Sequence, residues 1–462
     1  IYIYLIIFFC IKINHAQDGT IDSTFNIGNG FNDIVHDIKI QADGKIIAVG
    51  NFTTYNGNNC NRIVRINPNG SIDNSFQIGN GFDSWAFAIA LQTDGKIIIG
   101  GNFSSYKDTL IGARIIRLNQ DGTIDNSFNT GTGLGNAVFA IKIQNDGKIV
   151  VGGQFQNYDT SIVEKIVRIN QNGSIDNTFN IGTGFSGFNT FVRCLSIDND
   201  DKIIVGGTFN IYNGNNANNI VRLNTDGSYD PSFSIGSGFN SYILDVLPIN
   251  NKYLITGDFT NYNGNTANRI VMLNNNGSID SGFIIGSGFN AVSGTILMQT
   301  DNKFLISGSF STYNGNNTGK IIKLNSNGSI DNSFSVNINL IPKICLQSDN
   351  KIIAYGNFTS PTNRIVRLNN TLSSINENNF IPTFTIYPNP SSSLINIKSD
   401  MQIEKEYEII LYDFCGKQVY NKKATLGVNT IKQINTLNFP SGLYFIKLKN
   451  SEQEHSFKIV IE

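Results

Sequence analysis

Short apolar runs of strand length alternate with turns rich in Asn, Asp and Gly along most of the chain. In residues 140–179, three such runs are joined by turns and followed by a short fourth run that ends in a phenylalanine. This phenylalanine recurs at Phe25, Phe76, Phe128, Phe179, Phe233, Phe283 and Phe334. The spacings between these residues are 51, 52, 51, 54, 50 and 51. A fixed period near fifty residues is typical of a solenoid, a propeller or an array of repeats.

Each copy of the repeat contains three longer apolar runs that predict antiparallel strands. The first run covers residues 35–40, 87–91 and 139–143 in the first three copies. The second run follows a turn of the DGK type and begins at Lys45, Lys96, Lys148, Lys202, Lys252, Lys303 and Lys351. The third run begins at Arg62, Arg114, Lys165, Asn219, Arg269, Lys320 and Arg364. Val and Ile bounded by Asn-Gly or Asp-Gly pairs are a strong hairpin signal, because both turn positions need positive φ.

The number of runs predicts how the repeats close. Seven copies of the three-run set are present, but the short fourth run follows only six of them. The last set, residues 341–368, lacks it, whereas residues 20–25 form a fourth run that no set precedes. If the N-terminal strand completes the last blade, both irregularities are explained and no sheet edge stays open. Rings of four-stranded blades define a propeller, so we expect an all-β, seven-bladed β-propeller with N-terminal strand closure.

The repeated sequence motifs resemble those of a known family. The pattern NxDGSIDxSF, GxGF, DGKIIVGGxF and YNGNxxNRIVRLN is similar to the delta-60 repeat, a bacterial β-propeller family, and it covers residues 18–370. The fifth copy departs from the pattern at residues 247–252 (LPINNK), which are one residue shorter and lack the DGK turn. The last copy has lost the YNGN loop and keeps only residues 359–363. The resemblance implies the same propeller fold that the strand count predicts.

The fifty-residue repeat ends at residue 370, and the rest of the chain has a different sequence pattern. Residues 371–383 are polar and read as a linker, whereas alternation and turn spacing in residues 384–462 predict a small, Ig-like antiparallel β-sandwich. This part resembles the type A C-terminal sorting domain of type IX secretion. The landmarks are Tyr387, Pro388, Asn389, Pro390, Asp413, Gly416, Lys417, Gly442 and Tyr444, and then a terminal KIVI. The resemblance implies the type IX machinery as partner and export through the periplasm, which leaves the protein secreted or on the outer-membrane surface.

The first seventeen residues, IYIYLIIFFCIKINHAQ, have a composition of their own. Residues 1–11 are apolar but too short to span a bilayer, and a small residue follows at Ala16. We interpret residues 1–17 as a secretory signal peptide that is N-terminally incomplete. Cys10 keeps a lipoprotein anchor open as an alternative, although bulky Phe8 and Phe9 precede it.

Composition narrows the functions available to the propeller. Charged residues make up only 15% of the chain and the net charge is -1, so no basic stripe favours nucleic acid. In residues 18–370 the only His is His36 and the only Glu is Glu164. A catalytic triad or a zinc site would therefore depend on one histidine. We expect no cofactor and no metal, and we weigh bound calcium in residues 119–125 as the weaker alternative.

Aspartates are frequent but repetitive. Each stands three residues before the recurring phenylalanine, at Asp73, Asp125, Asp176, Asp230, Asp280 and Asp331. An Asp followed two positions later by Ser or Thr forms a turn through its own backbone, so these residues are expected to be scaffold. The cysteines are scattered along the chain without CxxC or other metal-ligand spacing. Cys194 takes the place of Ala140 in its repeat, so we expect a small apolar core residue and not a disulfide.

The remaining candidate is a surface formed by loops. The IGxGF loops and the YNGN loops should share one face of the ring, and the YNGN loops place a Tyr beside an Asn on four blades. These candidate binding residues are Tyr55, Asn56, Tyr212, Asn213, Tyr262, Asn263, Tyr313 and Asn314. An exposed Tyr ring beside an amide suits a sugar. The competing interpretation is that the tyrosines pack under their loops.

Two functions follow from this reading. The first is a non-enzymatic, monomeric surface protein for adhesion or for binding surface polysaccharide, another extracellular glycan or a protein. The second is a polysaccharide hydrolase or lyase on the same scaffold. An enzyme would need a unique polar cluster at the mouth of the ring, and the inner strands offer only His36, Arg193 and Asp245. The sequence therefore favours binding.

Overall fold

The computed structural model describes residues 18–336, 342–370, 384–399, 405–414, 416–426, 430–450 and 454–462. The predicted signal peptide and linker, residues 1–17 and 371–383, lie outside the described residues. Contacts divide the chain into two units, residues 1–372 and 373–462, and each is described by itself. The described residues form strands and turns without a helix. Accordingly, this part of the chain holds no helix that could cross a membrane.

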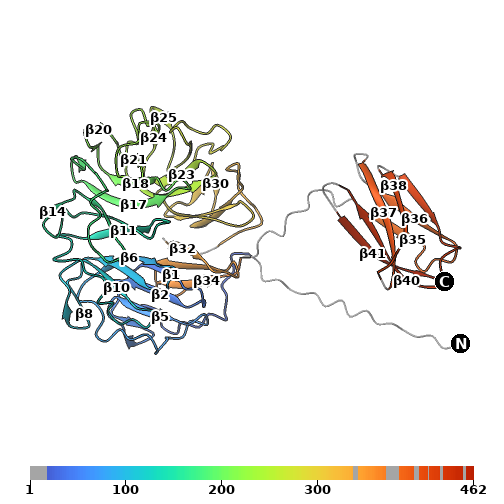
Figure 1. The fold of residues 1–462 in the computed structure, drawn as a ribbon, viewed down its shortest axis with the longest axis horizontal. Coiled ribbons are helices and arrows are strands. Elements are labelled where there is room, and N and C mark those ends of the chain that lie inside the picture. Colours follow the sequence, from blue (N-terminus) through green and yellow to red (C-terminus); the bar gives the residue numbers. More distant parts are fainter. Residues whose placement is uncertain are drawn as a thin grey trace. The chain divides into compact units, whose positions relative to one another are not determined.

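The blades of the first unit are seven antiparallel sheets, each formed by the three longer strands of one repeat (Figure 1). Their inner strands are β1 (Val35–Ile40), β6 (Ala86–Leu91), β11 (Val138–Ile143), β17 (Phe191–Ile197), β22 (Ile243–Ile249), β27 (Ser293–Met298) and β32 (Pro342–Leu346). The second strands are β2 (Ile46–Gly50), β7 (Ile97–Gly101), β12 (Ile149–Gly153), β18 (Ile203–Thr208), β23 (Lys252–Gly257), β28 (Phe304–Gly308) and β33 (Ile352–Gly356). The third strands are β5 (Ile63–Ile66), β10 (Ile115–Leu118), β15 (Ile166–Ile169), β21 (Ile220–Leu223), β26 (Ile270–Asn274), β31 (Ile321–Leu324) and β34 (Ile365–Leu368). The seven predicted blades are confirmed.

The inner strands form a ring. Each contacts the inner strand of the next blade, and β32 of the last blade contacts β1 of the first. The hydrophobic core lies mainly between neighbouring blades, as where Val49 of the first blade packs in one cluster with Phe82 and Ile89 of the second. Alternating Val and Ile are buried on both faces of the second and third strands, as expected for sheets covered on each side by a neighbour.

The N-terminal segment completes the last blade, as predicted. In the first six blades the fourth run pairs with the third strand through a single bridge, such as that between Ile66 and Ile72, so it is shorter than a full strand. The equivalent bridge of the seventh blade joins Ile21 to Leu368. The backbone N–H of Asp22 donates to the carbonyl of Arg367 at 2.8 Å. Residues some 345 positions apart thus meet in one sheet.

The recurring aspartates are scaffold, but they do more than turn the chain. Each accepts a hydrogen bond from the backbone two residues later, as from Ser75 to Asp73. In five blades the same carboxylate also receives an arginine Nε at 2.7 Å; the pairs are Arg65–Asp73, Arg117–Asp125, Arg168–Asp176, Arg222–Asp230 and Arg367–Asp22. Burial would raise the pKa of these carboxyls, but the bonds from Ser or Thr, Lys and Arg outweigh it and hold the pKa well below its usual range.

Short hairpins extend each of the first six blades on one face. They are β3 (Thr54–Tyr55) with β4 (Asn58–Asn59), β8 (Ser105–Tyr106) with β9 (Thr109–Leu110), β13 (Asn157–Tyr158) with β14 (Ser161–Ile162), β19 (Ile211–Tyr212) with β20 (Asn215–Asn216), β24 (Asn261–Tyr262) with β25 (Asn265–Thr266), and β29 (Thr312–Tyr313) with β30 (Asn316–Asn317). The IGxGF loops bridge to these hairpins, as Phe31 does to Tyr55, and in the fourth blade this loop includes β16 (Phe185–Ser186). The two loop families share a face, as predicted.

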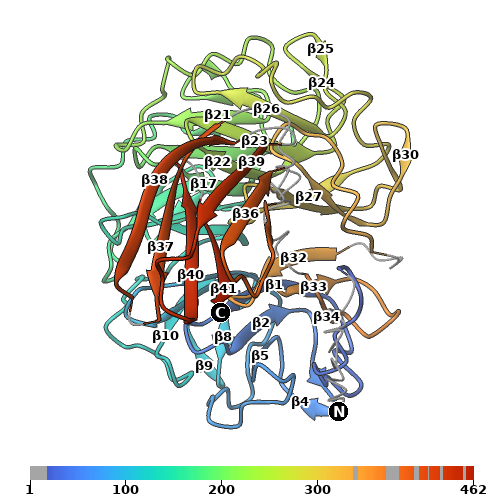
Figure 2. The same ribbon diagram turned by 90° about the vertical axis from the view of Figure 1, so that its right-hand side faces the viewer.

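The second unit is a small sandwich (Figure 2). One sheet contains β35 (Phe384–Tyr387), β36 (Leu394–Ser399) and β39 (Thr430–Asn435). The other contains β38 (Gln418–Leu426), β37 (Lys405–Asp413), β40 (Gly442–Lys449) and β41 (Glu454–Ile461). Side chains from both sheets, including Ile395 and Ile446, share one core. The predicted antiparallel sandwich is confirmed.

Candidate functional site

The four candidate tyrosines are not exposed platforms, and that expectation was wrong. Tyr55, Tyr212, Tyr262 and Tyr313 are at most 1% exposed. The Tyr262 hydroxyl donates to the carbonyl of Gly277 at 2.6 Å, and its ring packs 4.5 Å from that of Phe239. Burial accordingly raises the pKa of Tyr262 and of the other three phenols. The tyrosines hold each loop down on its own blade, which is the competing interpretation given above.

The neighbouring asparagines are exposed, yet they are also part of the loop framework. Asn56, Asn213, Asn263 and Asn314 all adopt positive φ at the tip of the hairpin. The side-chain oxygen of Asn263 accepts a hydrogen bond from the backbone N–H of Ser237 at 3.1 Å, and the other three make equivalent bonds. These four amides lie on four different blades, so the structure does not bring them together in one site.

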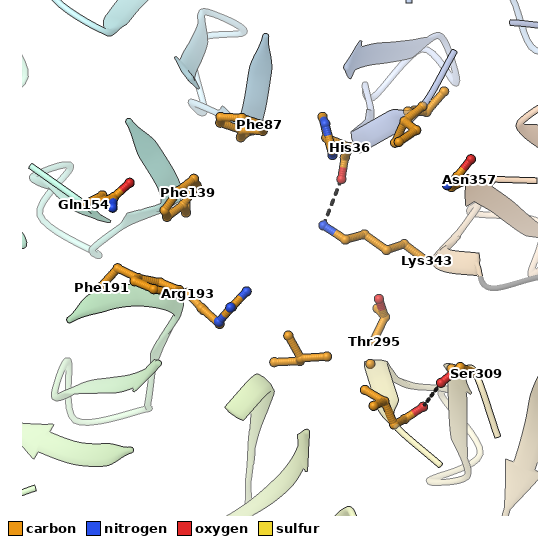
Figure 3. A pocket seen from close by; sticks show the side chains of 17 residues that line it. His36, Phe87, Phe139, Gln154, Phe191, Arg193, Thr295, Ser309, Lys343 and Asn357 are labelled. Carbon is orange, nitrogen blue, oxygen red and sulfur yellow. Dashed lines mark hydrogen bonds between the residues drawn. The ribbon is translucent and has the colours of Figure 1, made fainter. Parts of the chain in front are cut away.

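A pocket lies elsewhere on this face, at the mouth of the central channel. It has a volume of 570 Å³ and receives residues from all seven blades. On one side, four rings from neighbouring blades form an aromatic arc: His36, Phe87, Phe139 and Phe191 (Figure 3). Successive ring centroids are 4.9, 5.4 and 6.0 Å apart. The pocket volume lies within the roughly 300–1,000 Å³ of ordinary small-molecule sites.

β-Bulges direct these side chains into the mouth. In β1, β6 and β11 the pairing register with the second strand shifts by one residue, and the extra residue is His36, Phe87 or Phe139. The same shift in β17 and β22 presents Arg193 and Leu244. A bulge breaks the strict alternation of a strand and re-aims a side chain, which is common near binding sites. The same bulge therefore occurs in five blades and carries His, Phe, Arg or Leu.

Two cationic side chains point into the pocket (Figure 3). The Arg193 guanidinium lies over two aromatic rings, 4.5 Å from the centre of the Phe191 ring and 4.7 Å from that of Tyr242. Across the pocket, Lys343 Nζ donates to the backbone carbonyl of His36 at 2.9 Å. Lys343 reaches solvent in the channel, but protein surrounds it, and this burial lowers the pKa of its ammonium. Burial likewise lowers the pKa of His36, so we expect a neutral imidazole at pH 7.

Two aspartates lie one position further into the channel and are held by the scaffold. Asp37 accepts hydrogen bonds from the backbone N–H groups of Ile38 at 2.9 Å and of Ile89, in the next blade, at 2.8 Å. It also pairs with Lys39 at 2.9 Å. Asp245 repeats this arrangement with Val246 at 3.0 Å and Ile296, again in the next blade, at 2.9 Å. Each carboxylate therefore links two blades.

Burial affects the charges of this inner layer in different ways. It raises the pKa of Asp245, against the effect of the backbone bonds and of Lys142. Burial disfavours the ammonium of Lys39, but the adjacent Asp37 carboxylate outweighs it and raises the pKa of that lysine. Of the three inner-strand residues singled out from sequence, the structure brings His36 and Arg193 into the pocket, whereas Asp245 does not line it.

Sequence reasoning missed Phe87, Phe139 and Phe191 as a site and did not consider Lys343 at all. The signal that could have found Phe87 and Phe139 is their inner-strand position, which carries His36 and Arg193 in other copies. Phe191 stands two residues before that position. Lys343 was harder to find because β32 pairs with β33 without the bulge, so its register differs from that of the other blades. In the part of the chain that is described, no three His, Cys, Asp or Glu side chains are grouped to hold a metal ion.

The landmark residues of the sandwich have structural roles. Tyr387 ends β35, and after Pro388 the side chain of Asn389 donates to the carbonyl of Lys458 at 3.0 Å and accepts from Val460 N–H at 2.8 Å. The Asp413 carboxylate accepts from Lys417 N–H at 2.9 Å across a turn in which Gly416 has φ 79°. The remaining landmarks lie next to these, at Pro390, which follows Asn389, and at Gly442 and Tyr444, which are both in β40.

Comparisons with known proteins agree with both units. Seven segments match the family described as a domain of unknown function (DUF5122) beta-propeller: residues 41–76, 92–128, 144–179, 199–233, 250–283, 299–334 and 347–373. Residues 385–462 match the secretion system C-terminal sorting domain. This domain indicates export by type IX secretion, interaction with that machinery, and a secreted or cell-surface location.

A search of curated proteins finds no match. Among solved structures, the crystal structure of dimeric latent PorU from Porphyromonas gingivalis aligns with 81% of this chain at 10% identity and a TM-score of 0.15. The chain covers 32% of the length of that protein. So low a score carries no argument about fold or function. The repeats and the tail decide the assignment: the chain belongs to the DUF5122 β-propeller family and ends in a type IX secretion sorting domain.

Proposed function

We propose that this exported propeller is a non-enzymatic binding protein that holds an extracellular glycan in the mouth of its central channel. The observation that carries the proposal is the set of bulges that place different side chains around one 570 Å³ pocket. Because the bulge is the same in these blades and only its side chain changes, a specific site can form without a change in the strand pairing of the ring. The location outside the cell makes extracellular polymers the available ligands.

The aromatic arc suits a sugar. Sugars present flat faces of C–H groups, and aromatic rings provide extended apolar surfaces for them. Phe87, Phe139 and Phe191 are only partly buried, so their rings remain accessible from the pocket. The mouth also offers Gln154 and Asn357, which are exposed amides without hydrogen bonds to other described side chains. An amide group both donates and accepts, as sugar hydroxyls require.

The same geometry argues against the hydrolase alternative. Most glycoside hydrolases use two carboxyl groups that flank the scissile bond. Asp37 and Asp245 are the carboxylates nearest the pocket on the inner strands, and the backbone N–H groups of two blades occupy both of them. Neither lines the pocket. Their role as links between blades supports binding over catalysis.

The single tryptophan of the chain provides the test. Trp85 is 48% exposed and its ring lies 6.2 Å from that of Phe87, so its fluorescence should respond to a ligand in the mouth. We expect titration with laminarin, galactan, alginate or polygalacturonate to reveal saturable binding. Phe139→Ala should weaken this binding about tenfold or more, because burying an aromatic side chain is worth about 1.5–3 kcal/mol.

Phe188→Ala is the matched control. Phe188 is 92% exposed in the loop of the fourth blade and does not line the pocket, so its loss should leave affinity unchanged. Equal weakening by both substitutions would place the ligand over the loops and contradict the proposal. Release of new reducing ends from any of these glycans would support the hydrolase alternative instead.

A further inference from the structure

We propose that the ligand is an acidic saccharide whose uronate carboxylate binds between Arg193 and Lys343. This inference rests on the proposed function and adds the chemical class of the ligand. The two side chains come from the fourth and seventh blades, and both point into the same pocket (Figure 3). Their charges face a space that contains no carboxylate of the described lining.

Arg193 is positioned by neighbouring rings, but its guanidinium has no hydrogen-bond acceptor among the residues that the structure describes. Its guanidinium lies over the rings of Phe191 and Tyr242. Its Nε is buried and has no partner among the described residues. A buried donor without a partner is costly to a protein, and stacking fixes its fork in one orientation. Arginine in this setting is ready for a planar acceptor such as a carboxylate, which it can bind with two parallel hydrogen bonds.

Lys343 supplies the second positive charge. Its ammonium has three donors, and one of them is directed to the carbonyl of His36 at 2.9 Å. Nearby negative charge does not neutralise it, because Asp37 and Asp245 lie further into the channel and are engaged by backbone N–H groups and Lys39. Burial lowers the pKa of His36, and its imidazole adds no negative charge to the mouth. The mouth is therefore an anion site with an aromatic wall.

A uronic acid matches these groups better than an acidic peptide does. Its ring offers an apolar face to Phe87 and Phe139, its hydroxyls match the amides of Gln154 and Asn357, and its carboxylate matches the two cations. A bound peptide is usually recognised by backbone pairing with an exposed strand edge or by an extended groove. This pocket is instead a cavity at the centre of a ring, lined by side chains.

The test compares polygalacturonate with its fully methyl-esterified form, with the full-length protein and Trp85 fluorescence as the readout. Esterification keeps the sugar and removes the charge. The wild-type protein should bind the free acid about tenfold or more tightly, since charge-assisted hydrogen bonds are lost on esterification. Arg193→Gln should abolish that preference, and Lys343→Met should reduce it as an independent variant if Arg193→Gln does not fold.

Lys107→Gln is the matched control for non-specific attraction of a polyanion. Lys107 lies on the same face, in the hairpin loop of the second blade and over the ring of Tyr106, but outside the pocket. It should leave the preference intact. Equal affinity of the wild-type protein for both forms would overturn the acidic-saccharide assignment while leaving glycan binding in place. Stronger binding of dextran sulfate than of polygalacturonate would overturn it in favour of a sulfate ester. If no glycan, neutral or acidic, changes Trp85 fluorescence, the proposed function itself fails.

Discussion

Replacing Asp22 with alanine is expected to lower the free energy of unfolding of the propeller by about 3–5 kcal/mol, the usual cost of breaking a buried ion pair by removing one partner. Asp22 accepts from Arg367 Nε at 2.7 Å and from Lys351 Nζ at 2.6 Å. The Arg367 side chain is only 7% exposed. Without Asp22, its guanidinium stays buried next to the ring of Phe25 with no carboxylate. The N-terminal segment would then lose its strongest link to the last blade.

Asp280→Ala provides the internal control. In the fifth blade Met272 occupies the place of the arginine. Among the described residues, Asp280 forms an ion pair only with Lys252, whose side chain is 43% exposed. Exposed ion pairs contribute about 1 kcal/mol or less, so this substitution should be mild. Chemical denaturation, followed by circular dichroism and Trp85 fluorescence, measures the free energy of unfolding of both variants. If Asp22→Ala lowers the free energy of unfolding no more than Asp280→Ala does, pairing of the N-terminal segment with the last blade does not stabilise the propeller.

A similarly large loss is expected for Tyr262→Ala, about 3–5 kcal/mol, as for other buried aromatic side chains. The Tyr262 ring is 1% exposed and packs against Phe239, and its hydroxyl bonds to Gly277. Tyr262→Phe keeps the ring and removes the donor, so it should cost less, about 1–3 kcal/mol, for the carbonyl left without a partner. The same denaturation experiment checks both variants.

Glycan affinity distinguishes a site in the channel mouth from a site on the tyrosines of the hairpin loops. Tyr262→Phe should bind the glycan that the wild-type protein binds, with unchanged affinity, because Tyr262 does not line the pocket. A Tyr262→Ala protein that loses less than about 0.5 kcal/mol, as exposed positions do, and also loses glycan binding would show that the tyrosine is a ligand contact after all.

The repeats made most of the fold predictable. Apolar runs at a fixed period defined the blades, and the surplus fourth run at residues 20–25 predicted the pairing that is seen between Ile21 and Leu368. The turn in the irregular fifth copy also remained a hairpin: Asn250 and Asn251 both adopt positive φ between β22 and β23. These features could be predicted because turn residues and the alternation of apolar and polar residues determine strands and hairpins over only a few positions.

The site was less predictable for two physical reasons. The Asn-Gly pairs after the tyrosines leave open whether the rings are exposed, because their burial depends on the turn glycine fifteen residues later, such as Gly277 for Tyr262. The repetition of the tyrosine in six copies also indicates a structural role, as the repetition of the turn aspartates does. Several pocket residues stand on bulges, and a bulge such as that at Phe139 interrupts the alternation from which strand faces are read.

The most direct test of the central claim is to locate a bound ligand. Crystals of the full-length protein soaked with oligogalacturonate should show the sugar in the channel mouth, against Phe87 and Phe139. Its carboxylate should lie within hydrogen-bonding distance of Arg193. A sugar ordered over the hairpin loops at Asn56 or Asn263, with the channel mouth empty of it, would contradict the account.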